Sequence, residues 1–72
     1  MVIILKSNIP YLRHISGLYR IERKIALRNW LEEIGVKWNH DALVILNGNY
    51  CTGNEFLKDG DEIGLFIPIS GG

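Results

Sequence analysis

The chain of 72 residues contains a single cysteine, Cys51, and no apolar run long enough to span a bilayer. One cysteine excludes an internal disulfide and a zinc site built from cysteines, so we expect a cytoplasmic protein. A membrane-spanning helix needs about 20 consecutive apolar residues. The apolar start, residues 1–5, has no basic leader and no small-residue cleavage site, which favours a strand over a signal peptide. We therefore expect no membrane association.

The sequence also lacks the motifs of nucleotide-binding and catalytic proteins. It has no glycine-rich phosphate loop of the GxxxxGK or GxGxxG type. His14 and His40 are far apart in the sequence and predict no metal site. Cys51 has no nearby histidine to serve as the base that a nucleophilic cysteine requires. These absences predict a protein that is not an enzyme and binds no cofactor of its own.

Charge is unevenly distributed along the chain, although the formal net charge is zero. Residues 1–30 hold six basic side chains against one acidic, and residues 31–72 hold two against seven. No aromatic residues are interleaved with the basic ones as stacking platforms, so we expect no nucleic-acid binding. The acidic half could attract a basic partner or could be ordinary solvated charge, and the sequence leaves both open.

Hydrophobic patterns predict one small α+β domain over residues 1–72. Aliphatic runs at residues 2–6 and 42–46 are typical of interior strands that are buried on both faces. Alternation predicts a strand at residues 18–22, paired as a hairpin with the first, and a last strand at residues 62–67.

One clear helix is predicted at residues 23–34. Its apolar residues fall on a single stripe: Leu27, Trp30, Leu31 and Ile34. Gly35 is suited to the position after its last turn, but no Ser, Thr, Asp or Asn stands at the expected start. One helix can cover only one face of a sheet, so we expect a mixed sheet of four or five strands packed on one main helix.

The C-terminal stretch, LKDGDEIGLFIPISGG, shows the most specific pattern in the chain. Asp59-Gly60 predicts a tight turn that leads into the last strand, and Pro68 ends that strand. We expect Ser70, Gly71 and Gly72 to form a flexible tail. Glycines have no Cβ and fit a narrow slot, and three extended residues reach about 10 Å. Such a tail can deliver a C-terminal carboxylate into the active site of a partner.

The residues next to the tail predict a docking surface made of apolar anchors and acidic side chains. The anchors are Phe66, Pro68 and Ile69, and the acidic residues are Asp59, Asp61 and Glu62. Exposed aromatic side chains often dominate an interface, but a rotated strand would place Phe66 in the core instead. The carboxylates could steer a basic partner surface or could be ordinary turn residues.

The C-terminal pattern resembles that of the MoaD/ThiS family of sulfur carriers, most closely the small subunit of molybdopterin synthase. Two further segments share this resemblance, Leu12-Arg13-His14-Ile15-Ser16-Gly17 and Leu46-Asn47-Gly48. The similarity spans nearly the whole chain in order and implies the ubiquitin-like β-grasp fold. It also implies that Gly72 is adenylated by a ubiquitin-activating-like adenylyltransferase, which binds ATP and magnesium, and is then converted to a thiocarboxylate.

Several acceptors and fates of the activated Gly72 stay open. The resemblance implies sulfur donation in cofactor biosynthesis, with the large subunit of molybdopterin synthase or an enzyme of the thiazole synthase type as acceptor. A thiamin-pathway carrier and a ubiquitin-like modifier joined to lysine through Gly72 use the same activation chemistry. An interaction module with an incidental tail is the third possibility.

Overall fold

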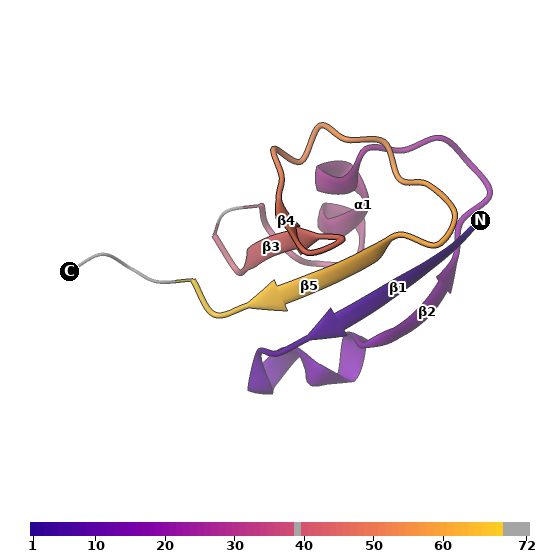
Figure 1. The fold of residues 1–72 in the computed structure, drawn as a ribbon. Helices are drawn as coiled ribbons and strands as arrows, with labels where there is room; N and C mark the ends of the chain where they lie inside the picture. The colour runs from indigo at the N-terminus through magenta and orange to yellow at the C-terminus, as the bar shows by residue number, and fades with distance from the viewer. Residues whose placement is uncertain (39, 69–72) are drawn as a thin grey trace.

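A computed structural model describes residues 1–38 and 40–68. It contains a five-stranded mixed sheet of order β2-β1-β5-β3-β4 with a helix on one side (Figure 1). The elements are β1 (Val2–Ser7), the 3-10 helix η1 (Pro10–Ile15), β2 (Gly17–Arg20), α1 (Leu27–Glu33), β3 (Leu43–Leu46), β4 (Asn49–Tyr50) and β5 (Glu62–Phe66). β1 and β5 run parallel, and the other neighbouring strands are antiparallel. This arrangement agrees with a small α+β fold of the ubiquitin-like type. Neither helix in the described ranges is long and apolar enough to cross a membrane.

The two faces of the sheet differ in burial. Ile3 and Leu5 of β1 are buried toward α1, together with Ile63 and Leu65 of β5. The residues between them face the other way and, with their register partners, form what we call the open face: Val2, Ile4, Lys6, Leu18, Arg20, Leu43, Ile45, Tyr50, Glu62, Gly64 and Phe66. The prediction that the aliphatic strands are buried on both faces is therefore wrong. Their second set of aliphatic residues lies on this partly exposed surface.

The helix is shorter at its start than the predicted range 23–34. Ala26 has an extended backbone and forms an isolated β-bridge with Phe56, so the helix begins only at Leu27. The first N–H groups of a helix have no partner within the helix. Here Leu27 donates to the carbonyl of Glu55 at 2.8 Å, and Arg28 donates to that of Gly53 at 2.9 Å. Backbone carbonyls of a distant loop thus replace the side-chain cap that the sequence lacks.

The end of the helix follows the sequence prediction. Gly35 has φ +96°, the left-handed conformation that glycine adopts without strain. Its N–H donates to Glu32 at 3.1 Å, and Val36 donates back to Leu31 at 2.9 Å, a pattern that closes the last turn. Leu31 is completely buried, whereas Ile34, the last residue of the predicted stripe, is only half-buried.

The loop that caps α1 is held together by the carboxylate of Glu55. It accepts hydrogen bonds from Thr52 N at 2.9 Å, Gly53 N at 2.8 Å and Thr52 Oγ1 at 3.2 Å. The hydrogen bond from the Thr52 backbone is the main cause that lowers the pKa of Glu55 below its ordinary value of 4.5. A carboxylate with a lowered pKa adds stability above the ordinary value, and this stability is lost as pH falls through the lowered pKa.

We expect Glu55→Gln to lower the free energy of unfolding by about 1 kcal/mol at pH 7, because charged acceptors make the stronger hydrogen bonds. The difference from the unsubstituted protein should shrink as the pH is lowered past 4.5, since protonation removes the charge of Glu55 that the glutamine variant already lacks. Urea unfolding at pH 7 and in acid measures it. Glu22→Gln, at an exposed position before α1, is the control. A loss that stays constant with pH would contradict this assignment.

Candidate functional site: the open face and the base of the C-terminal segment

The base of the C-terminal segment is fixed at the centre of the sheet. β5 lies between β1 and β3 and leads toward the C-terminus (Figure 1). Beyond the ladder itself, Asn8 N donates to the carbonyl of Leu65 at 2.8 Å. A strand hydrogen-bonded on both sides is a rigid support for whatever follows it.

β5 ends one residue earlier than the sequence predicts. Alternation along residues 62–67 places Ile67 in one set with Ile63 and Leu65, which would be buried together, but Ile67 is 56% exposed. It lies outside the ladder, directly before Pro68, which has no N–H to donate to a neighbouring strand. The exposed Ile67 therefore adds to the apolar surface at the base of the C-terminal segment, and Pro68 beside it is half-buried.

Four residues of the predicted site lie outside the described residues. They are the anchor Ile69 and the tail residues Ser70, Gly71 and Gly72. Their assigned roles stay predictions.

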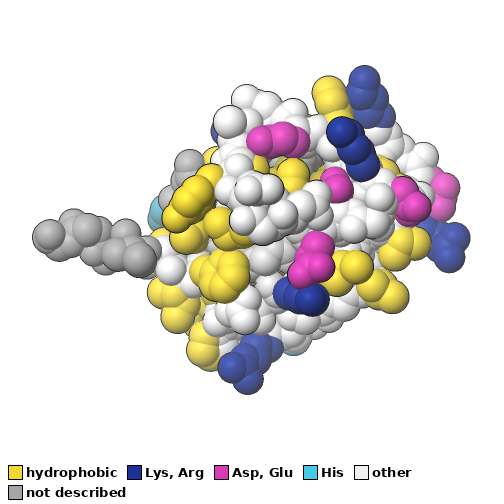
Figure 2. Space-filling model, in the orientation of Figure 1, with side chains coloured by type: hydrophobic (Ala, Val, Ile, Leu, Met, Phe, Trp, Pro, Cys, Tyr) yellow, Lys and Arg dark blue, Asp and Glu magenta, His cyan; other side chains and the backbone are white. Residues whose placement is uncertain are grey.

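Phe66 points to the open face, as predicted, with 39% of its side chain exposed. Its register partner on β3 is Leu43, which lies on the same face. The alternative in which Phe66 packs in the core is therefore excluded. Figure 2 shows hydrophobic side chains gathered at the end of the sheet from which the C-terminal segment leaves.

Sequence reasoning missed the remainder of this apolar surface. Leu18 and Tyr50 are among the most exposed large hydrophobic side chains, and both belong to the open face. Ile4 is paired with Leu18, and Ile45 is paired with Tyr50. The signal was present in the aliphatic runs, but their assignment to one face depends on the pairing register, which the runs do not fix.

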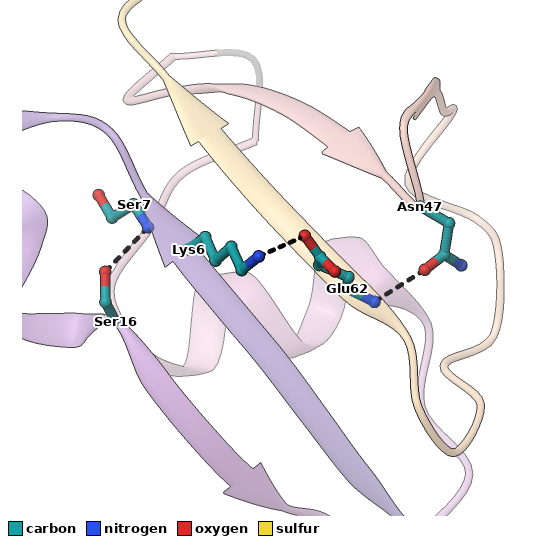
Figure 3. Close-up of polar contacts among 5 residues, drawn as sticks. All are labelled: Lys6, Ser7, Ser16, Asn47 and Glu62. Atoms are coloured by element: carbon teal, nitrogen blue, oxygen red, sulfur yellow. Dashed lines mark hydrogen bonds and ion pairs between the residues drawn. The ribbon is translucent and has the colours of Figure 1, made fainter.

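An ion pair crosses the open face between the two central strands. Lys6 Nζ lies 2.9 Å from Glu62 Oε1, and both side chains are substantially exposed (Figure 3). The backbone N–H of Glu62 donates to Asn47 Oδ1 at 2.8 Å, which ties the start of β5 to the residue after β3. Ser7 N donates to Ser16 Oγ at 2.9 Å, which ties the end of β1 to the start of β2. The face thus combines an apolar surface with one ion pair and, at its edge on β2, the exposed Arg20.

The three acidic residues assigned to docking have different environments. Asp61 is only 8% exposed, and its two oxygens accept from Lys58 N at 2.8 Å and from Asn47 Nδ2 at 2.9 Å. Asp61 is therefore part of the turn before β5, and its placement on a docking surface is wrong. Asp59 is exposed, although its carboxylate accepts from Val2 N at 2.7 Å. Glu62 is exposed on the open face beside Lys6.

We expect Asp61→Asn to destabilise the fold by about 1–3 kcal/mol. An amide has only one acceptor oxygen, so its NH2 group would face either Lys58 N or Asn47 Nδ2, and that hydrogen bond would be lost. Asp59→Asn is the matched control, since the amide oxygen can still accept from Val2 in an exposed position. Thermal unfolding of both variants gives the comparison. Equal stabilities of the two variants would show that Asp61 does not hold the turn.

Cys51 is placed where its thiol is a weak nucleophile. Its Sγ donates to the carbonyl of Val44 at 3.5 Å. Burial raises the pKa of this thiol, so the thiolate is disfavoured at neutral pH. Within residues 1–38 and 40–68, no three side chains of His, Cys, Asp or Glu are grouped so that they could hold a metal ion.

A mixed sheet with a central strand that leads into the C-terminal segment defines a small protein of the ubiquitin-like class. The family model described as the ThiS family matches residues 20–72, and the chain belongs to this family. Its members are small carrier proteins and not enzymes, which confirms the resemblance to sulfur carriers at the level of the family. A search of curated proteins finds no match for the chain.

Proposed function

We propose that the protein is a sulfur carrier that bears a thiocarboxylate on Gly72. The observation that carries the proposal is the ThiS family match, which runs from residue 20 through residue 72 and so includes the Gly71-Gly72 tail. The geometry supports it, because β5 is the central strand and reaches the base of this segment from a rigid sheet. The protein is then a co-substrate, and the catalytic groups belong to its partners.

The chemistry begins at a carboxylate, which is a poor electrophile. Attack of the Gly72 carboxylate on the α-phosphate of ATP forms an acyl adenylate and releases pyrophosphate. Sulfide then attacks the carbonyl carbon and the C–O bond to AMP breaks, so that sulfur replaces one carboxylate oxygen with no change of oxidation state. ATP and magnesium are bound by a ubiquitin-activating-like adenylyltransferase in this proposal.

The sulfur acceptor is, in this proposal, the large subunit of a molybdopterin synthase. The resemblance to the small subunit of that enzyme supports this choice. An acceptor of the thiazole synthase type is the second candidate, and the family match fits either acceptor. Incubation of the thiocarboxylated protein with each acceptor, followed by mass measurement of the carrier, separates the two. Only the true acceptor should return the carrier to its carboxylate form in the presence of the acceptor's substrate.

The mass of the protein isolated from its own cells tests the carrier role against the modifier role. An oxygen-to-sulfur exchange at the C-terminus is expected for a carrier. A Gly72 remnant on lysines of other proteins, without the exchange, would contradict the proposal and support a ubiquitin-like modifier.

The docking surface proposed for the activating enzyme is the end of the open face around Phe66, together with Ile67, Pro68 and Ile69. We expect Phe66→Ala to raise the KM for the carrier in ATP–pyrophosphate exchange by about tenfold, the size of an interface hot spot. The kcat should change little, because Phe66 is not the reacting residue.

Phe56→Ala is the control for loss of an exposed aromatic side chain. Phe56 is about half exposed, but it lies against Ala26 and Lys24 in the segment before β5. Its removal should leave the KM near that of the unsubstituted protein. The same KM in both variants would remove Phe66 from the docking surface.

A further inference from the structure

Gly64 lies in the middle of β5, on the open face, where a glycine is unfavourable for a strand. Its register partners are Lys6 on β1 and Ile45 on β3. Five described glycines have positive φ, but Gly64 does not, so its backbone conformation suits any L-residue. The reason for a glycine at this position has to be sought in the space above it.

That space is occupied by the ring of Phe66. A Cβ built on Gly64 would lie 3.0 Å from Cε2 and 3.5 Å from Cζ of this ring. A carbon–carbon distance of 3.0 Å is shorter than van der Waals contact. The next neighbour, Cβ of Ile45, would be at 3.9 Å, an ordinary contact. The ring therefore leans back along β5 onto the bare backbone of Gly64, and it is the one neighbour that a larger residue would displace.

The ring also forms one side of a shallow pocket of about 170 Å³ on the open face. Ile45, Gly64 and the Lys6–Glu62 pair line the same pocket. A methyl group at position 64 would both occupy its floor and push the ring away from the strand.

We propose that Gly64 is a positioning residue, which lets the Phe66 ring pack against the backbone of β5 in the orientation that the activating enzyme binds. This inference rests on the proposed function. A side chain that is already ordered before binding loses less conformational freedom on association. Gly64 would therefore affect docking only through the orientation of Phe66. Its own contacts with the partner would add nothing to the affinity.

A double-mutant cycle in ATP–pyrophosphate exchange tests the proposal. The variants are Gly64→Ala, Phe66→Leu and the two combined, assayed with the adenylyltransferase from the same cell. We expect Gly64→Ala alone to raise the KM for the carrier roughly fivefold with unchanged kcat, a partial loss of a hot-spot contact. In the Phe66→Leu background the same change should have no further effect, because the ring that it displaces is absent.

An unchanged KM for Gly64→Ala would overturn the proposal, and so would an equal increase in both backgrounds. A second measurement needs no enzyme and no alanine variant. The ring current of Phe66 should displace the Gly64 Hα resonances in the unsubstituted protein, and Phe66→Leu should abolish this displacement. Absence of the shift overturns the proposed ring placement. If the unsubstituted protein is not adenylated at all, the proposed function fails, and the resonance shift still decides where the ring lies.

Discussion

Deletion of Gly72 should abolish activation of the protein and leave its fold intact. The deletion moves the terminal carboxylate back by one residue, about 3.5 Å along an extended chain. In enzyme active sites a misplacement of about 1 Å can cost on the order of 100-fold in rate. We therefore expect the rate of ATP–pyrophosphate exchange to fall by more than about 100-fold, the largest functional effect of any change considered.

Ser70→Ala is the control for this deletion, because it changes the tail and keeps its length. Its exchange rate should stay within about twofold of the original, as is usual for a small substitution away from the reacting atom. The buried core lies between Ile3 and Leu65, so the melting temperature of the truncated chain should stay close to that of the full chain. Normal adenylation of the truncated chain would exclude Gly72 as the activated residue.

Most of the sheet could be predicted from local patterns. The turns at Asn47-Gly48 and at Gly60 have the positive φ values that these residues tolerate, and the strands follow the aliphatic runs. The start of α1 could not be predicted in this way. Its first N–H groups bond to carbonyls of Gly53 and Glu55, more than twenty residues away, and no local signal marks such a contact.

The candidate site was predicted only in part, because some of its features also depend on contacts between residues that are distant in the sequence. The outward direction of Phe66 follows from alternation along one strand. The burial of Asp61 depends on the Asn47 side chain, fourteen residues away, which bonds to it only when β3 and β5 are paired. The breadth of the open face likewise depends on the register of five strands. Neither could be derived from the turn and strand residues alone.

Adjacent residues of β5 should separate stability from function. Leu65 is completely buried against the helix side of the sheet, whereas Phe66 points to the open face. Leu65→Ala leaves a cavity and should cost about 2–5 kcal/mol. A domain of this size has a total stability of about 4–11 kcal/mol, at 0.05–0.15 kcal/mol per residue. Each kcal/mol shifts the melting temperature by about 4–8 °C, so we expect a decrease of at least about 8 °C.

Phe66→Ala should show the opposite behaviour, because the ring is only partly buried and fills no space in the core. Its melting temperature should fall by a few degrees at most, a loss of about 0.5 kcal/mol that is usual for a surface substitution. Its KM in the activation assay should nevertheless rise. Thermal denaturation followed by circular dichroism compares the two variants directly. Equal destabilisation would contradict the assignment of neighbouring side chains to opposite faces, and with it the use of the open face for docking. Unequal destabilisation, with the KM effect confined to Phe66, would mean that β5 supports the fold through one face and recognition through the other.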